Sequence, residues 1–159
     1  MKIKAQKLTA EAFAPFGAYT DLLHPTGYSL GAFYADRLLM DVSGALPVAF
    51  SPLSVDKPAR YVVTAAEYHN TTAEGILPLD ADVVIHVAPP SAEPVPELTQ
   101  AFLVPKGTLV RLNVGVWHLC ALPVDQPHVN ILIVLPQRIY KNDCVVVQYA
   151  PEQHIEIEL

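Results

Sequence analysis

The sequence has little positive charge and no long apolar run. Its 159 residues include only 10 Lys and Arg against 16 Asp and Glu, which gives a net charge of -6. The few cations are spread thinly, and no basic cluster with interleaved aromatic residues can follow a phosphate backbone, so we expect no nucleic-acid partner. No stretch approaches the roughly 18 to 20 apolar residues of a membrane-spanning helix, so we expect no membrane partner.

Cysteine is also scarce, since only Cys120 and Cys144 are present. Both lie in apolar, strand-like surroundings, where free buried thiols are common, and two cysteines do not indicate a disulfide framework. The N-terminal sequence MKIKAQKLTAEAFAPFG lacks the continuous apolar segment of a secretory signal. The lack of such a segment, together with the lack of a membrane-spanning run, predicts a cytoplasmic protein.

Short apolar segments punctuated by proline and glycine make up most of the chain. Hydrophobic residues account for 52% of the sequence, and the fifteen prolines suit strand ends and turns rather than helices. One helix is expected early, with Thr9 as its N-cap and Gly17 at its end. Residues 88–97 read as a loop between paired strands, and residues 151–159 as a last edge strand. We therefore predict an all-β sandwich or barrel, in a single domain over residues 1–159.

Glu67 and His69 are the first candidate site residues. Residues two apart in a strand project on the same face, so both side chains would point into a barrel interior. A buried carboxylate is destabilising unless it finds a cation or several hydrogen-bond donors, and a bound ion would supply that partner. An alternative stays open for Glu67, because Thr64 to Glu67 also reads as a capping box at a helix N-terminus.

The region around His118 resembles the second signature of the cupin superfamily, G-x5-P-x-G-x2-H-x3-N. Gly107, Gly115 and His118 match its spacing, with Asn113 at the proline position and Leu122 at the final asparagine. The resemblance implies a cupin-type double-stranded β-helix, or jelly-roll, barrel with a short N-terminal helix. It also implies that His118 points into the barrel and binds a metal ion.

An altered form of the first cupin signature lies upstream. Glu67, His69 and Glu74 read E-x-H-x4-E, where the superfamily usually carries H-x-H before its glutamate. The resemblance implies a metal site made of Glu67, His69, Glu74 and His118. Imidazole and carboxylate together favour no single divalent ion, so Zn, Mn, Ni and Fe all remain candidates.

Three longer stretches resemble the ureidoglycolate lyase family of small cupins. They are residues 7–21 (KLTAEAFAPFGAYTD), 67–79 and 97–123, the last of which contains the V-W-H motif. The resemblance implies a homodimeric lyase that eliminates urea from ureidoglycolate, or a similar small ureido or hydroxy acid, to give glyoxylate. It also implies catalytic roles for His69 and His118, and we predict Glu74 as a third catalytic residue beside them. Leu119 stands where the family carries a second histidine, and Glu74 where it carries glutamine, so we expect a divergent member.

Residues that would bind a small carboxylate substrate are harder to choose. Arg111 and Lys106 are candidate partners for the carboxylate, because an anionic ligand in an acidic protein needs a local cation. Trp117 either stacks on the substrate or fills the core. Two alternative functions stay open: a non-catalytic or regulatory cupin that binds a small metabolite, and a structural dimer with a vestigial pocket.

Overall fold

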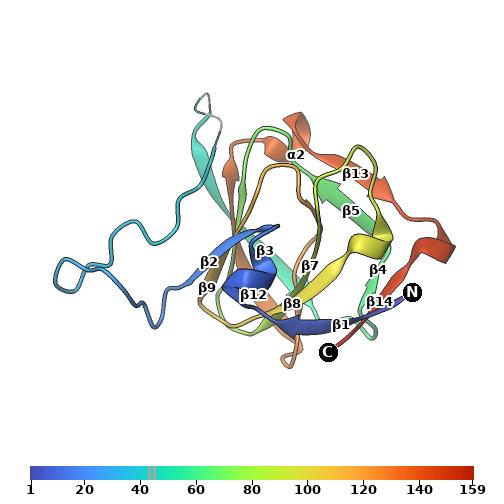
Figure 1. Cartoon of the computed structure of the whole chain (residues 1–159), viewed down its shortest axis with the longest axis horizontal. Helices are drawn as coiled ribbons and strands as arrows, with labels where there is room; N and C mark the ends of the chain where they lie inside the picture. The colour runs from blue at the N-terminus through green and yellow to red at the C-terminus, as the bar shows by residue number, and fades with distance from the viewer. Residues whose placement is uncertain (43, 45) are drawn as a thin grey trace.

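The computed structural model describes residues 1–42, 44 and 46–159, and strands dominate it. Two sheets face each other across the barrel (Figure 1). The larger sheet runs in the order β13 (Val145–Gln148), β5 (Ala65–Tyr68), β10 (Trp117–His118), β7 (Val83–Ala88), β8 (Gln100–Val104), β1 (Lys2–Lys7), β14 (Ile155–Glu158) and β4 (Val62–Val63), with β11 (Leu122–Pro123) paired to β7.

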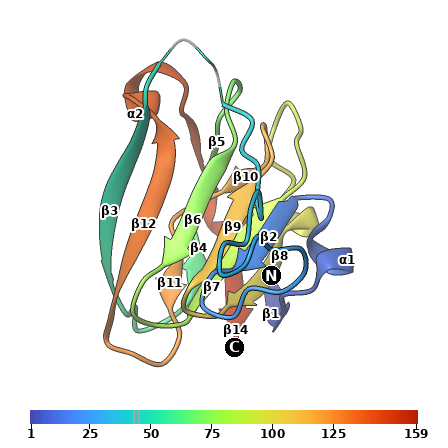
Figure 2. The same cartoon turned by 90° about the vertical axis from the view of Figure 1, so that its left-hand side faces the viewer.

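The smaller sheet holds the other five strands side by side, as Figure 2 shows. Its order is β2 (Gly17–Asp21), β9 (Thr108–Leu112), β6 (Glu74–Pro78), β12 (His128–Pro136) and β3 (Val48–Asp56). The helical elements are short: α1 (Ala10–Phe13), α2 (Ile139–Asn142), and the 3-10 turns η1 (Pro96–Leu98) and η2 (Pro151–Gln153). No helix in the described part of the chain has the length and apolar character needed to span a membrane.

Side chains on the two faces of β7 belong to two different cores. Val83, Ile85 and Val87 face the space between the sheets, together with residues such as Phe102 and Ile131. Val84 and Ala88 face the other way and pack in a second cluster. Because alternate residues of a strand point to opposite faces, a strand buried on both sides reads as the continuous apolar run seen here.

The second cluster lies on the outer face of the larger sheet. It contains Trp117 from β10, Tyr149, and Ile155 and Ile157 from β14. β14 pairs in parallel with β1 and antiparallel with β4, so it lies inside the sheet. The prediction that residues 151–159 form an edge strand is therefore wrong, because β1 and β4, its neighbours on the two sides, are both far from it in the sequence.

The N-terminal helix is present but shorter than predicted. The side chain of Thr9 caps it, accepting a hydrogen bond from the Ala12 N–H at 3.3 Å. The helix ends at Phe13, since Pro15 has no N–H with which to continue the hydrogen-bond ladder. Gly17 instead opens β2, where a Cβ would meet the backbone oxygen of Arg111. The all-β, cupin-like barrel with a short N-terminal helix is confirmed.

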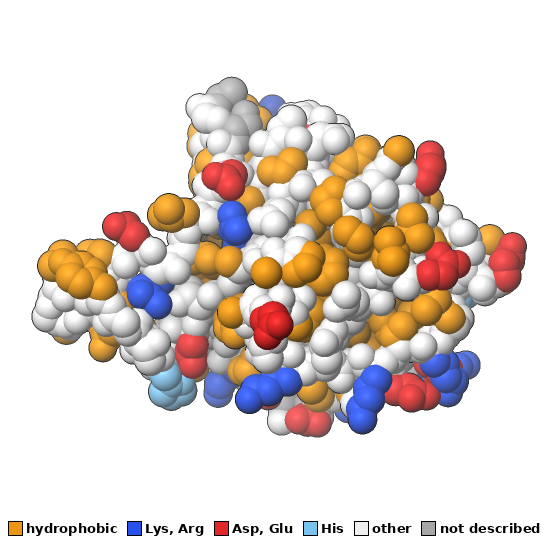
Figure 3. Space-filling model, in the orientation of Figure 1, with side chains coloured by type: hydrophobic (Ala, Val, Ile, Leu, Met, Phe, Trp, Pro, Cys, Tyr) orange, Lys and Arg blue, Asp and Glu red, His pale blue; other side chains and the backbone are white. Residues whose placement is uncertain are grey.

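A segment between β2 and β3 projects from the barrel (Figure 1). It carries exposed apolar side chains, among them Tyr28, Leu30, Phe33 and Leu39. In the space-filling view, hydrophobic atoms gather at the tip of this projection (Figure 3). Polar side chains, among them His69, Glu74 and His118, are buried where β5, β6 and β10 meet.

Candidate functional site

Three strands from the two sheets bring the candidate residues together. Glu67 on β5 lies directly opposite His118 on β10 in an antiparallel pair. His69 follows the last residue of β5, and Glu74 is the first residue of β6 in the facing sheet. Because Glu67 lies within a strand, the alternative that it caps a helix is wrong. All four side chains predicted as metal ligands therefore converge at one end of the barrel.

A glycine turn fixes the position of His118. Gly115 lies between β9 and β10 with a φ of 81°, a left-handed conformation that glycine adopts without strain. Its N–H donates to the carbonyl of His69 at 2.8 Å, which joins the backbones that carry the two histidines. The turn after β9 thus sets the position of both histidines.

Glu74 bridges the two buried histidines. Its Oε2 lies 3.0 Å from Nε2 of His69 and 2.9 Å from Nε2 of His118. The opposite ring nitrogens are also held, because Nδ1 of His69 lies 2.6 Å from the carbonyl of Asp143, and Nδ1 of His118 lies 2.9 Å from that of Val116. We call His69, Glu74 and His118 the His–Glu–His centre.

This arrangement requires positive charge. A carbonyl oxygen only accepts hydrogen bonds, so both Nδ1 atoms carry a proton, and a neutral imidazole then has a bare lone pair at Nε2. That lone pair faces the Glu74 carboxylate, which is also an acceptor when ionised. Either the imidazoles are protonated, or a cation lies among these atoms.

The pKa values of the centre shift in the direction that the ion pairs favour. Burial alone would lower the pKa of each histidine and raise that of Glu74, since it disfavours charged groups. Hydrogen bonds and charge pairing outweigh burial, so the pKa values of His69 and His118 are raised and that of Glu74 is lowered to about 2. A charged carboxylate between partly protonated imidazoles is therefore the stable form near neutral pH.

The same residues fit a divalent metal ion. Glu67, His69 and His118 each offer a ligand atom, and these atoms all lie within 4.8 Å of one another. Both histidines point Nε2 inward and anchor Nδ1 to a carbonyl, an arrangement that orients metal-binding imidazoles in proteins. The donor set of imidazole and carboxylate suits Zn, Mn, Ni or Fe without choosing among them.

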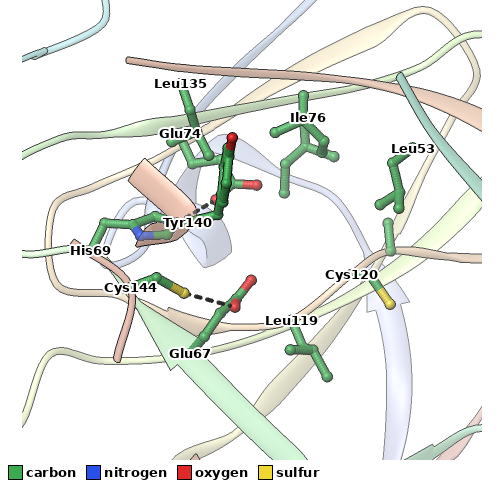
Figure 4. A pocket seen from close by; sticks show the side chains of 12 residues that line it. Leu53, Glu67, His69, Glu74, Ile76, Leu119, Cys120, Leu135, Tyr140 and Cys144 are labelled. Carbon is green, nitrogen blue, oxygen red and sulfur yellow. Dashed lines mark hydrogen bonds and ion pairs between the residues drawn. The ribbon is translucent and has the colours of Figure 1, made fainter. Parts of the chain in front are cut away.

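A cavity of about 360 Å³ opens beside the centre. Figure 4 shows His69, Glu67 and Glu74 on one side of it, with Leu53 and Ile76 across from them. His118 does not line the cavity and reaches it through Glu74. The cavity lining consists of Leu53, Glu67, His69, Glu74, Ile76, Leu119, Cys120, Ala121, Ile133, Leu135, Tyr140 and Cys144.

Residues just after α2 form hydrogen bonds to Glu67 and to the backbone that follows His69, both at the edge of the cavity. The Asp143 carboxylate accepts hydrogen bonds from the backbone N–H groups of Asn70 and Thr71, both at 2.8 Å, and from the Thr71 hydroxyl. The next residue, Cys144, donates its thiol to Oε2 of Glu67 at 3.2 Å. Burial, followed by this contact, raises the pKa of the Cys144 thiol to about 12, so the sulfur stays protonated. The sequence carries no local signal for either role, because both depend on contacts more than seventy residues away.

The residues predicted to bind substrate lie elsewhere. Trp117 is on the other face of β10, with its ring 4.4 Å from that of Tyr68 between centroids and its Nε1 donating to Ser91 Oγ at 3.0 Å. Arg111 has Nη1 3.4 Å from Asp41 on the projecting segment. Lys106, in the turn between β8 and β9, lines shallow depressions away from the centre. Their roles in substrate binding stay predictions.

His86 is a buried residue outside the centre. It lies on β7, and burial lowers its pKa to about 4, so the ring is neutral at ordinary pH. Within the described part of the chain its Nε2 has no hydrogen-bond partner. A core position for His86 agrees with the apolar sequence around it.

A solved structure resembles this one at the level of the fold. The crystal structure of a dTDP sugar isomerase from Desulfovibrio desulfuricans G20 superimposes with a TM-score of 0.51 at 11% identity, covering 87% of this chain and 85% of that one. At such identity the likeness concerns the fold alone. It supports the cupin-like barrel independently of the sequence motifs.

Sequence comparisons give a closer relationship. Ureidoglycolate lyase from Rhodobacter capsulatus is 30% identical over 135 residues, which cover 79% of this chain and 81% of that protein. Ureidoglycolate lyase from Pseudomonas aeruginosa strain LESB58 is also 30% identical, over 136 residues and 78% of each chain. A family model described as ureidoglycolate lyase matches residues 1–157. The chain therefore belongs to the ureidoglycolate lyase family.

Proposed function

We propose that the protein is a carbon–nitrogen lyase that releases urea from a small ureido hydroxy acid such as ureidoglycolate, leaving glyoxylate. Membership in the family supports a lyase. The observation that carries the proposal is the Glu74 bridge, 3.0 and 2.9 Å from two histidine nitrogens beside a cavity of metabolite size. This bridge places a carboxylate and two imidazoles, which can act as base and acid, side by side at the edge of the cavity.

The reaction needs one proton removed and one supplied. The substrate hydroxyl loses its proton, its carbon–oxygen bond becomes a carbonyl, and the carbon–nitrogen bond breaks as the urea nitrogen takes up a proton. Glu67 and His69 line the cavity, so we assign the Glu67 carboxylate as proton acceptor and protonated His69 as donor. Glu74 keeps His69 charged, His118 helps to keep Glu74 ionised, and return of the proton from Glu67 to His69 completes the cycle.

A divalent ion fits the same residues. Glu67, His69 and His118, with Glu74 beside them, would hold it in place of the proton on Nε2 of His69, so this is a second form of the site in which His69 is a ligand and not the proton donor. When bound, such an ion would polarise the hydroxyl and carboxylate oxygens of the substrate. The small-molecule carboxylate substrate would then gain a positive partner in a cavity whose described lining residues include no Lys or Arg.

The direct test is to supply ureidoglycolate to the purified protein and measure urea and glyoxylate. Equal amounts of both products are expected. His69→Asn should abolish turnover, and His118→Asn should reduce it less, because His118 acts through Glu74. His24→Asn is the matched control, since His24 is exposed and, within the described part of the chain, its ring hydrogen-bonds only to Asp21, three residues earlier.

Absence of product above background from folded protein would contradict the lyase proposal. If such inactive protein still bound small hydroxy acids, the alternative of a non-catalytic metabolite-binding cupin would replace it. A melting temperature that rises in the presence of glycolate would report that binding.

We also propose a cytoplasmic homodimer. Cys120 and Cys144 are both free, as a reducing compartment would keep them. Phe33 on the projecting segment and Phe50 on the edge strand β3 leave large apolar side chains exposed, which a second copy would cover. Light scattering should give twice the chain mass of 17.3 kDa, and a value of 17.3 kDa would contradict the dimer.

A further inference from the structure

The cavity beside the centre is polar at one end only. Glu67, His69 and Glu74 lie together on one side in Figure 4. The rest of the lining is largely aliphatic. We call this second part the apolar wall and define it as Leu53, Ile76, Leu119, Ala121, Ile133 and Leu135.

The charged groups of the cavity also lie at its polar end. Among the described residues that line the cavity there is no Lys or Arg, and the charged groups are those of the polar end. A polar group placed against the apolar wall would lose its hydrogen bonds to water without replacement, which is destabilising. A ligand that fills this cavity therefore carries its polar atoms at one end and an apolar group at the other.

The size of the cavity leaves room for that apolar group. At about 360 Å³ the cavity lies within the range of roughly 300–1,000 Å³ that is typical of pockets for small organic ligands. A two-carbon acid joined to a urea group leaves part of this space empty. An adjoining depression of about 250 Å³ shares Leu53, Ile133 and Leu135 with the cavity and is otherwise mostly apolar, with Ser51 and Arg138 also in its lining.

Leu119 connects the centre to the apolar wall. It follows His118 at the end of β10, and its side chain lines the cavity below Ile76 in Figure 4. Ala121, two residues on, also lines it. Residues of the His–Glu–His centre and of the apolar wall are therefore only a few positions apart in the chain here. An apolar group on the substrate carbon nearest the polar end would contact Leu119.

We propose that the preferred ligands are 2-hydroxy acids that bear an alkyl group on carbon 2, and the 2-hydroxy-2-ureido acids that are the urea adducts of the corresponding 2-oxo acids. The carboxylate and hydroxyl lie at the polar end, and the alkyl group lies against Leu119 and the rest of the apolar wall. The polar end of this placement rests on the proposed function. Elimination from such an adduct moves the hydroxyl proton to nitrogen, breaks the carbon–nitrogen bond, and yields a 2-oxo acid and urea without any further reactant.

The test is a binding series measured by calorimetry on the full chain. Glycolate, lactate, 2-hydroxybutanoate and 2-hydroxypentanoate extend the alkyl group one carbon at a time. Each added methylene that reaches the apolar wall should tighten the dissociation constant about fourfold. Affinity that is flat or falls along the series would overturn the proposal.

A pair of variants locates the effect. Leu119→Asn should reduce the gain to less than twofold per methylene, because a polar side chain replaces part of the wall. Leu98→Asn is the matched control, since Leu98 is half exposed in η1 and lies outside the cavity. Folding of both variants is checked by circular dichroism, and the wild-type series remains decisive if Leu119→Asn does not fold. If folded Leu119→Asn still gained fourfold in affinity with each methylene, the alkyl group would not lie against Leu119, and the proposed placement would be overturned.

The outcomes separate this inference from the proposed reaction. If affinity rises along the series but no urea is released from ureidoglycolate or its alkyl homologues, the reaction fails and the ligand class stands. If urea is released from ureidoglycolate while longer acids bind more weakly, the reaction stands and the ligand class fails.

Discussion

The protonation of three side chains decides the chemistry of the site. His69 and His118 each fix their ring through Nδ1 and direct Nε2 at Glu74, so the carboxylate holds its charge only while a positive partner is present. The two histidine pKa values are raised and the Glu74 pKa is lowered for the same reason. Folding stability must therefore change with pH on both sides of a window.

The ion pairs should stabilise the fold most between about pH 4.5 and 6.5. Because the folded histidines titrate above their usual 6.5, their contribution is complete below that pH and is lost as pH rises through the raised pKa. Because Glu74 titrates near 2 instead of 4.5, its contribution is complete above 4.5 and is lost as pH falls toward 2. Urea unfolding of wild type and Glu74→Gln at several pH values measures the difference.

Within the window, Glu74→Gln should lower the free energy of unfolding by roughly 3 kcal/mol, since it leaves buried imidazoles without their partner. The difference should shrink at pH 3 and at pH 9. Glu93→Gln, at an exposed loop position, is the control and should show no such profile. A difference that does not vary with pH would show that Glu74 is not ionised between the histidines.

At the scale of elements, short connections hold the site residues in register. The turn before β10 and the segment after α2 each add hydrogen bonds just beyond the end of β5, next to its strand pairing with β10 and β13. Both act through the backbone around His69. Changes in either connection should therefore affect stability and activity together.

Gly115→Ala tests the first connection. Alanine in a left-handed conformation is disfavoured, and its Cβ would also lie 3.3 Å from that of Pro90. We expect a loss of roughly 1–2 kcal/mol in unfolding free energy, together with reduced turnover as His118 shifts. Gly44→Ala is the control, because a Cβ there meets none of the described residues within 4 Å. Wild-type stability in Gly115→Ala would contradict this role of the turn.

Asp143→Ala tests the second connection. It removes the acceptor for the N–H groups of Asn70 and Thr71, and we expect roughly 1.5–3 kcal/mol of destabilisation with a lower kcat/KM. Thermal unfolding and steady-state kinetics provide the measurements. Asp125→Ala, at an exposed position, should leave both unchanged. Equal stability and equal kcat/KM in the two variants would mean that the hydrogen bonds of Asp143 do not hold His69 in position.

The elements also show what the sequence can predict. Apolar segments bounded by proline and glycine locate most strands, and the spacing of Gly107, Gly115 and His118 predicts the turn that positions the histidine. The place of β14 between β1 and β4, and the hydrogen bonds of Asp143, depend on pairing between segments distant in the chain. Local patterns carry no information on such pairing. Which strand face Trp117 occupies likewise depends on the second core that β14 completes.

On the scale of the whole molecule, one end of the barrel is filled by the apolar core and the other holds a charged centre beside a cavity. Packing stabilises the first end. The second end holds buried polar groups that packing alone does not stabilise. A metal ion bound to these groups would add its binding free energy to the stability of the barrel.

Metal binding should therefore raise the melting temperature. At about 100 times the dissociation constant, Zn²⁺, Mn²⁺, Ni²⁺ or Fe²⁺ is expected to add about 2.7 kcal/mol to the stability of wild-type protein. A chelator should reverse the shift, and the double variant His69→Asn/His118→Asn should show none. An equal shift in the double variant would place the ion elsewhere, and no shift in wild type would contradict a metal cofactor.

The central claim is that the His–Glu–His centre drives release of urea. The most direct measurement is kcat/KM for urea formation from ureidoglycolate by wild-type protein and by folded Glu74→Gln at pH 7. We predict turnover by wild type and a loss of at least about 100-fold in Glu74→Gln, because His69 no longer stays protonated to donate to the leaving nitrogen. Wild-type activity in Glu74→Gln would contradict the account.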